Sequence, residues 1–237
     1  MTKTSVFIIN PNSSESVTNN LKNVLVMSPN VEYNFYTAPP EAPKEISGHK
    51  SSLESERIVL PDLLKKGVLD KYDGFLVCCY SDHPLIHSLG QRTRKPVLGI
   101  MQATLTYSLL SSLVNKLFIL TSFSDWEPLL DQGIIDYVGS DRFPLGKFQK
   151  TKALNISVLD LSDPKEFAKI RERVNYFLNV EYAKEKINCV LLGCAGMAGL
   201  DSKLSESFPN VLFIDSVKVG VDLLVTLIKF NSTNLNI

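Results

Sequence analysis

Two cysteines are the residues of this chain whose type and placement best suit acid-base chemistry. Cys79 follows the apolar run 74–78, and Cys194 follows the apolar run 189–193. Small or polar residues come next, Tyr-Ser-Asp after Cys79 and Ala-Gly-Met-Ala-Gly after Cys194. The pattern predicts a strand, a turn and then a helix, where free N–H groups should lower a thiol pKa from its reference of about 8.5. We therefore expect both thiolates to form near neutral pH.

Two thiols on opposite sides of a substrate can invert a carbon that bears a weakly acidic hydrogen. One thiolate removes the proton from one face, and the other thiol delivers a proton to the opposite face. The enolate-like carbanion formed between these steps needs hydrogen-bond donors near its oxygen. The candidate donors and substrate-binding residues are Asn10, Asn12, Tyr80, Ser81, Thr121, Ser122, Gly193, Ala195 and Gly196.

The other two cysteines are predicted to be structural. Cys78 and Cys189 lie within the apolar runs, and strand alternation turns Cys78 away from the face that Cys79 uses. Four cysteines in 237 residues do not make a disulfide scaffold, and none of their spacings is typical of a metal site. We expect free thiols and a cytoplasmic protein without a metal or other cofactor.

Composition narrows the choice of partner to a small molecule. Lys plus Arg and Asp plus Glu are each 25, so no basic field would gather nucleic acid or anionic lipid. The longest apolar runs, 190–194 and 221–228, are far shorter than the ~20 residues that span a bilayer. With 44% hydrophobic residues, the chain can bury one or two cores.

Short apolar runs alternate with amphipathic stretches of helical length, which predicts an α/β fold with parallel sheets. The expected strands are residues 5–9, 32–36, 74–78, 97–100, 116–120, 155–159, 189–193 and 211–214. The expected helices are residues 14–27, 53–67, 102–114, 126–132, 164–185 and 216–230.

The second half of the chain repeats the first. Residues 5–13 correspond to 116–124, residues 73–81 to 188–196, and residues 96–100 to 209–214, at nearly equal spacings. The repeat predicts two similar α/β units. Because ligands bind beyond the carboxyl ends of parallel strands, two facing units would pool Asn10, Cys79, Thr121 and Cys194 in one cleft.

At these residues the chain resembles the hydantoin and allantoin racemases of the aspartate/glutamate racemase superfamily. The resemblance is carried by Ile-Asn-Pro-Asn-Ser-Ser (9–14), by residues 37–46, by Cys79-Tyr-Ser-Asp82, by Pro-Val-Leu-Gly-Ile (96–100) and above all by Leu-Gly-Cys194-Ala-Gly-Met. Amino-acid racemases of the superfamily usually carry Gly-Cys-Thr-Glu at the last motif, so a cyclic ureide is the better expectation.

The resemblance implies two α/β domains related by a pseudo-twofold axis, without metal or pyridoxal phosphate, and commonly a homo-oligomer. In that architecture the final helix returns to the first domain. We therefore expect one domain from residues 1–103 plus 216–237, a second from residues 104–215, and an active site in the cleft between them.

Three residues depart from the pattern of the bacterial relatives. Where those relatives have Cys-x-Gly-Asp-Pro, this chain has Ser81 in place of the glycine, and His83 stands between the aspartate and Pro84. Where the family has a glutamate, this chain has Gln102. These changes bear on the choice of substrate more than on the catalytic class. We expect His83 to be a solvent-exposed loop residue rather than a base for Cys79.

Other functions remain compatible with these residues. A related two-cysteine isomerase or decarboxylase could use the same thiols, although arylmalonate-type decarboxylases chiefly need the second cysteine. A catalytically silent nitrogen-metabolite binding or sensor protein would bind ligand without turnover. A redox protein would join Cys79 and Cys194 in a disulfide.

Overall fold

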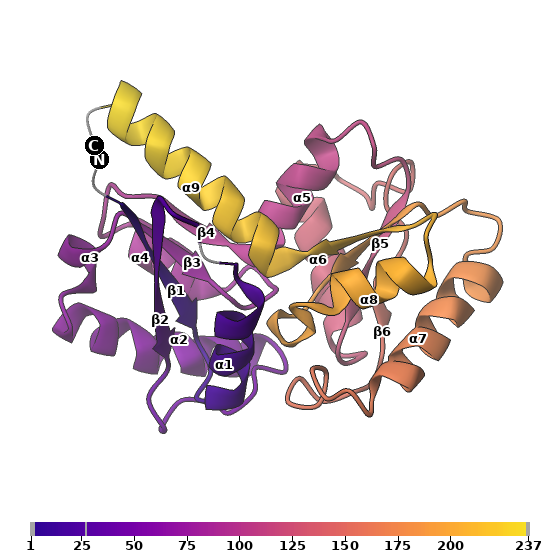
Figure 1. Ribbon diagram of the computed structural model, residues 1–237, viewed down its shortest axis with the longest axis horizontal. Coiled ribbons are helices and arrows are strands. Elements are labelled where there is room, and N and C mark those ends of the chain that lie inside the picture. The colour runs from indigo at the N-terminus through magenta and orange to yellow at the C-terminus, as the bar shows by residue number, and fades with distance from the viewer. Residues whose placement is uncertain (1–2, 27, 236–237) are drawn as a thin grey trace. The chain divides into compact units, whose positions relative to one another are not determined.

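The computed structural model describes residues 3–26 and 28–235, which form two compact units (Figure 1). Unit 1 ends at Ala103 and resumes at Val217, and unit 2 is Thr104–Ser216. Helix α5 (Ile100–Leu110) begins in the first unit and continues into the second. Unit 1 is therefore discontinuous in sequence, whereas unit 2 is one continuous segment.

Unit 1 is built on a parallel sheet of strand order β2-β1-β3-β4. The strands are β1 (Thr4–Asn10), β2 (Val31–Thr37), β3 (Gly74–Val77) and β4 (Val97–Gly99). The helices are α1 (Glu15–Val24), α2 (His49–Lys65), α3 (Val68–Lys71), α4 (Pro84–Gly90) and α9 (Ser216–Asn234).

Alternating side chains of β1 and β3 cover both faces of this sheet. On one face the strands pack against α2 and α4 in a core that includes Phe7, Ile9, Phe75, Val77, Val59, Leu63, Leu85 and Leu89. Helix α9 covers the opposite face, drawn in yellow in Figure 1. A Cβ atom at Gly220 would lie 2.9 Å from Leu76 Cδ1, and one at Gly74 would lie 2.7 Å from Ile228 Cδ1. Glycine at both positions lets α9 approach the strands closely.

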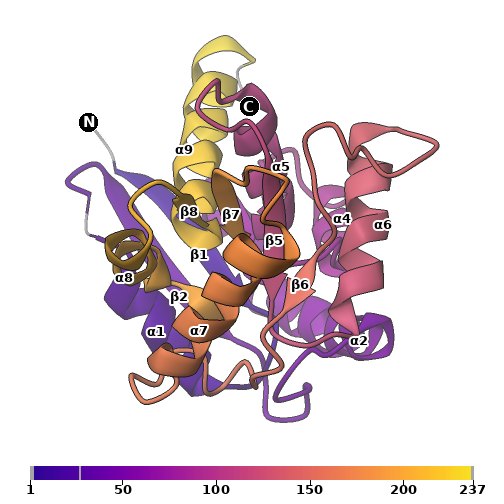
Figure 2. The same ribbon diagram turned by 90° about the vertical axis from the view of Figure 1, so that its right-hand side faces the viewer.

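Unit 2 repeats this arrangement with the strand order β6-β5-β7-β8. Its strands are β5 (Leu117–Thr121), β6 (Lys152–Ala153), β7 (Cys189–Leu192) and β8 (Leu212–Asp215), all parallel. Its helices are α6 (Trp126–Val138), α7 (Phe167–Tyr176), which continues as one π-helical turn (Phe177–Glu181), and α8 (Leu200–Ser207). Figure 2 shows α6 on one side of this sheet and α8 on the other, as right-handed crossovers require.

The two sheets confirm the predicted α/β fold of two similar parallel-sheet units. In each, the first strand of the unit lies second in the sheet, the third strand lies beside it, and the fourth forms an edge. The repeat read from the sequence therefore corresponds to matching strands: β1 with β5, β3 with β7 and β4 with β8.

Several predicted elements were wrong in detail. The predicted strand 155–159 is a loop, and the short strand β6 precedes it, because Asn155 adopts a left-handed backbone conformation with φ of 56° that a strand cannot contain. The predicted helix 164–185 is shorter than expected: α7 spans Phe167–Tyr176 and continues only as the π-helical turn Phe177–Glu181. The predicted end of the first helix, Met27, lies outside the described residues, and α1 ends at Val24. Helices α3, α4 and α8 were not predicted.

Across the described residues, 3–26 and 28–235, no helix combines the length and apolar character needed to cross a membrane.

Candidate active site

The strand registers place Cys79 and Cys194 at equivalent positions of the two units. In unit 1 the N–H of Cys78 donates to the carbonyl of Ile9 at 2.8 Å, one residue before Asn10 ends β1. In unit 2 the N–H of Gly193 donates to the carbonyl of Leu120 at 2.8 Å, one residue before Thr121 ends β5. Cys79 is the next residue after Cys78, and Cys194 is the next residue after Gly193. Each thiol thus lies beyond the carboxyl end of the inner strand of its own sheet, where ligands bind in such folds.

Cys79 is partly buried and does not lie at a helix end. Its Sγ lies 3.5 Å from the hydroxyl of Ser81, and helix α4 begins only at Pro84. Burial of the thiol raises the pKa of Cys79 to about 11, and the hydrogen bond with Ser81 offsets only part of this effect. The expected lowering of this pKa was therefore wrong, because loss of hydration outweighs the field of a helix that starts several residues later.

We expect Cys79 to react slowly with iodoacetamide at neutral pH, because the thiolate is the nucleophile. The alkylation rate, followed by mass spectrometry of the peptide that contains Cys79, should rise with an apparent pKa of about 11. Free cysteine, with a pKa of about 8.5, is the reference reaction. A plateau at the pH where free cysteine titrates, in protein shown to be folded by circular dichroism, would contradict this expectation.

Cys194 begins a tight turn at the end of β7. It caps a single 3₁₀ turn, Ala195–Met197, and its carbonyl accepts from the N–H of Met197 at 3.0 Å. The residue is buried, with 9% of its surface exposed. The N–H groups of Ala195 and Gly196 come before the first hydrogen bond of this turn, which makes them candidate donors to a substrate oxygen.

At position 196 of this turn there is no room for a side chain. A Cβ atom there would lie 2.6 Å from the carbonyl oxygen of Val158 and 3.1 Å from Val158 Cγ1. The loop that contains Val158 therefore packs directly on the segment that follows Cys194.

Gly196→Ala should lower the free energy of unfolding by about 1–3 kcal/mol, because backbone must move to relieve the contact with Val158. Urea unfolding measures this change. Gly146→Ala is the matched control in the same unit, since a Cβ atom at Gly146 would meet nothing within 4 Å. Equal stability of the two variants would show that the loop at Val158 moves aside at no cost.

All four cysteines are free thiols, and Cys78 and Cys189 have the surroundings of structural residues. Cys78 is 2% exposed and Cys189 is fully buried at the start of β7. Burial raises the pKa of Cys189 to about 12.

Asn10 and Asn12 shape the loop between β1 and α1. The amide nitrogen of Asn10 donates to the carbonyl of Ser14 and to the hydroxyl of Thr18, each at 3.0 Å. Its oxygen accepts from the N–H of Asn12 at 3.2 Å, and Asn12 Oδ1 accepts from the N–H of Ser14 at 2.9 Å. Asn10 has no amide hydrogen left for a substrate, so it positions the loop. The amide nitrogen of Asn12 has no acceptor among the described residues and is the available donor.

Thr121 and Ser122 occupy the corresponding place in unit 2, and both are 1% exposed. The hydroxyl of Thr121 donates to the carbonyl of Gly193 at 3.4 Å, which ties the end of β5 to the residue before Cys194. The carbonyls of Thr121 and Ser122 accept from the N–H groups of Leu154 and Ile156. Thr121 is thus a link within the unit, and its contact with substrate stays a prediction.

His83 is fully buried, so its predicted exposure was wrong. It caps helix α4: its Nδ1 accepts from the N–H of Leu85 at 3.2 Å, and Pro84 takes the first helical position. Nε2 then carries the proton of the neutral ring, and it is buried without a partner among the described residues. Burial lowers the pKa of His83 to about 4. The imidazole is therefore neutral at physiological pH.

Gln102 joins α5 to the loop that follows Cys79. Its Nε2 donates to Asp82 Oδ1 at 2.9 Å, and His87 Nε2 lies 2.9 Å from the same oxygen. A Cβ atom at Gly99 would collide with Gln102 Oε1, so the glycine that ends β4 makes room for this amide. A glutamate at position 102 would place two carboxylates together, whereas the amide donates. Tyr80 and Ser81, the other predicted binding residues of this loop, are buried.

No group of three or more His, Cys, Asp or Glu side chains that could hold a metal ion occurs in residues 3–26 and 28–235.

Comparison with known proteins identifies the family. The family model described as Asp/Glu/Hydantoin racemase matches residues 6–224. Protein DCG1 of Saccharomyces cerevisiae is 31% identical over 244 residues, which cover 96% of this chain and 98% of that protein. The hydantoin racemase of Rhizobium meliloti is 25% identical over 91% of this chain and 85% of its own length. Allantoin racemase from Klebsiella pneumoniae superimposes with a TM-score of 0.81 at 24% identity, over 97% of this chain and 89% of that one. The match over nearly the whole chain, together with two equivalent sheets of the same strand order, shows that this chain belongs to the Asp/Glu/Hydantoin racemase family.

Proposed function

We propose that this racemase acts on a 5-substituted hydantoin or on allantoin, with Cys79 and Cys194 as its two acid-base groups and no cofactor. The observation that carries the proposal is the placement of the two thiols beyond the same strand end of two equivalent sheets. The proposal requires the thiols to lie on opposite faces of one substrate ring in a cleft between residues 1–103 plus 216–237 and residues 104–215.

The ring carbon of such a substrate lies between a carbonyl and a ring nitrogen. When one thiolate takes its hydrogen as a proton, the electron pair of the broken C–H bond delocalises onto the carbonyl oxygen. The opposite thiol then gives its proton to the other face of the carbon and becomes the thiolate. No atom is gained or lost overall, and the two sulfurs exchange protonation states. Before the same enantiomer can be turned over again, Cys194 must lose a proton to solvent and Cys79 must regain one.

The surroundings of Cys79 support one role for it in this proposed cycle. Because its pKa is raised to about 11, Cys79 is protonated at neutral pH and serves as the proton donor for the enantiomer that Cys194 deprotonates. The N–H groups of Ala195 and Gly196 and the amide of Asn12 are the proposed donors to the enolate oxygen. Tyr80, Ser81, Ser122 and Gly193 complete the proposed substrate contacts.

The experiment is to incubate single enantiomers of allantoin and of several 5-substituted hydantoins with the protein in D2O. Optical rotation follows inversion, and NMR follows loss of the ring C–H signal, after subtraction of the spontaneous rate. We expect inversion to be accompanied by deuterium entry for at least one substrate. An absence of exchange across the panel, with thiols reduced and fold intact, would count against a cyclic ureide substrate.

A catalytically silent binding protein is the second candidate, and the raised pKa of Cys79 is the observation in its favour, because a thiol that stays protonated is a weak base. Saturable binding of a cyclic ureide without any deuterium entry, retained in a variant that lacks both thiols, would select this function.

A further inference from the structure

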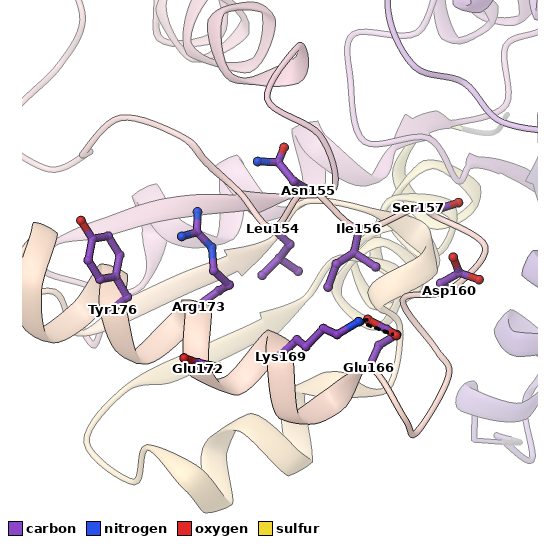
Figure 3. Close-up of a pocket in the computed structure, with 10 residues that line it drawn as sticks. All are labelled: Leu154, Asn155, Ile156, Ser157, Asp160, Glu166, Lys169, Glu172, Arg173 and Tyr176. Carbon is purple, nitrogen blue, oxygen red and sulfur yellow. Dashed lines mark hydrogen bonds and ion pairs between the residues drawn. The ribbon is translucent and has the colours of Figure 1, made fainter.

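Unit 2 contains a cavity of about 570 Å³ that is formed without Cys194 (Figure 3). It lies between helix α7 and the loop that follows β6. Its lining residues are Leu154, Asn155, Ile156, Ser157, Asp160, Glu166, Lys169, Glu172, Arg173 and Tyr176. The volume suits a small organic molecule.

Arg173 is exposed and gives one end of this cavity a positive charge, and the neighbouring Glu172 also lines the cavity. The guanidinium carbon of Arg173 lies 4.8 Å from the ring centre of Phe177 and 5.7 Å from that of Tyr176. Among the described residues it has no ion pair, whereas the neighbouring Lys169 pairs with Glu166 at 2.9 Å. Figure 3 shows Arg173 rising from α7 toward the loop, between Tyr176 and Lys169. A guanidinium held in this way is suited to bind a carboxylate through two parallel hydrogen bonds.

Asn155, above Arg173 in Figure 3, adds a polar group on the loop side. Its backbone is left-handed, with φ of 56°, a conformation that asparagine adopts more readily than most residues other than glycine. Asn155 Oδ1 accepts from the N–H of Ser124 at 3.1 Å, which leaves its amide nitrogen as a donor. Asn155 thus presents its amide N–H groups at the end of the cavity that holds Arg173.

Asp160 lies toward the other end of the cavity in Figure 3 and has the opposite charge. Its own N–H donates to the carbonyl of Ser157 at 3.0 Å, and its carboxylate has no ion pair in residues 3–26 and 28–235. A carboxylate oxygen in this position can only accept hydrogen bonds, so it favours a ligand group that carries N–H. The cavity therefore offers a cation at one end and an acceptor at the other.

We propose that this cavity is a second ligand site, which binds a small carboxylate that also carries N–H groups, either a ureido acid or an amino acid. Arg173 and Asn155 hold the carboxylate, and Asp160 accepts from the ureido or ammonium N–H. Hydrolytic opening of a cyclic ureide ring yields a ureido acid. The choice of a ureido acid as ligand therefore rests on the proposed function.

The loop that lines the cavity also supports the candidate active site within unit 2. The N–H groups of Leu154 and Ile156 donate to the carbonyls of Thr121 and Ser122 at 2.9 and 3.2 Å. Two residues farther along the same loop, Val158 packs on Gly196. We therefore expect a ligand held between α7 and this loop to stabilise the backbone that positions both strand ends of the unit.

Isothermal titration calorimetry of the whole protein tests the site with N-carbamoyl-L-alanine, L-alanine and propionate. We expect one of the two N–H-bearing acids to bind, and propionate to bind about tenfold more weakly or not at all. Arg173→Gln should weaken binding by at least about tenfold, since it removes a charge-assisted pair. Asp160→Asn should weaken only the acids that carry N–H. Arg171→Gln is the matched control, because Arg171 is an exposed arginine of the same helix that does not line the cavity.

A Cys79→Ser, Cys194→Ser double variant should bind as the wild type does, which separates this site from the proposed active site. Amide hydrogen exchange at Leu154 and Ile156 should slow on binding. The calorimetric readout does not depend on turnover, so failure of the proposed function leaves this test intact. Absence of binding by all three acids, equal losses in Arg173→Gln and Arg171→Gln, or loss in the double variant would each overturn the proposal.

Discussion

Replacing Cys79 or Cys194 with serine should slow inversion by about 10³-fold while leaving hydrogen exchange at one face of the ring carbon. If only one thiol remains, it can still remove the proton from its own face, exchange with solvent and return a deuteron to that face. The expected result is deuterium entry with retained configuration, for one enantiomer in Cys79→Ser and for the opposite enantiomer in Cys194→Ser.

The measurement is the ratio of hydrogen exchange to inversion for each pure enantiomer in D2O. Chiral chromatography or NMR after chiral derivatisation distinguishes the two enantiomers, and NMR follows the deuterium content. Cys189→Ala is the matched control, because it removes a thiol that is fully buried within β7. It should retain the wild-type ratio in both directions. A two-thiol mechanism is excluded if the two serine variants exchange the same enantiomer, or if either keeps wild-type inversion.

The second large effect concerns the dependence of stability on pH at His83. Its folded-state pKa is lowered from 6.5 to about 4 because the ring is buried. Above pH 6.5 the ring is neutral in both states, and its full contribution to stability is present. As the pH falls from 6.5 toward 4, the unfolded chain binds a proton that the folded protein excludes. We expect the exclusion of this proton to lower the free energy of unfolding by about 3 kcal/mol when the pH has fallen to 4.

Urea unfolding of the wild type and of His83→Asn at a series of pH values between 7 and 4 would measure this cost. Asparagine can still cap α4 through its side-chain oxygen, so the variant removes the titration and keeps the helix start. The carboxylates of the chain contribute equally to both proteins and cancel in the difference. His87→Asn, at an exposed histidine of the same helix, is the control that should follow the wild type. Parallel curves for the wild type and His83→Asn would mean that the imidazole is not protected from protonation.

Much of the fold could be predicted because strands and their ends are local properties of the sequence. The apolar runs before Cys79 and Cys194 lie in buried strands, and their similarity predicted two sheets of one design. The loop 155–159 was mistaken for a strand because Ile156 and Val158 alternate with polar residues. In the structure Asn155 has a left-handed backbone, and its side chain accepts a hydrogen bond from the N–H of Ser124. Hydrophobicity alone does not record such a bond.

The chemistry of single residues was harder to predict, since it depends on what surrounds them. Cys79 was expected to have a low pKa and has a high one, because burial outweighs the turn that follows it. His83 was expected on the surface, yet its role as the cap of α4 could have been found from the Pro84 that follows it. The hydrogen bonds that commit Asn10 to its own loop join residues four and eight positions away, and a strand-end pattern does not predict them.

The discontinuity of unit 1 affects the order in which the two units can fold during synthesis on the ribosome. Unit 2 is continuous from Thr104 to Ser216, so all of its strands emerge before α9 has been synthesised. The sheet of unit 1 emerges first, but the face of β3 that carries Gly74 and Leu76 stays uncovered until α9 arrives. The usual order, in which the amino-terminal domain completes its folding first, is therefore reversed here. A nascent chain halted before Val217 would hold a finished second unit and a first unit that still exposes an apolar sheet to chaperones.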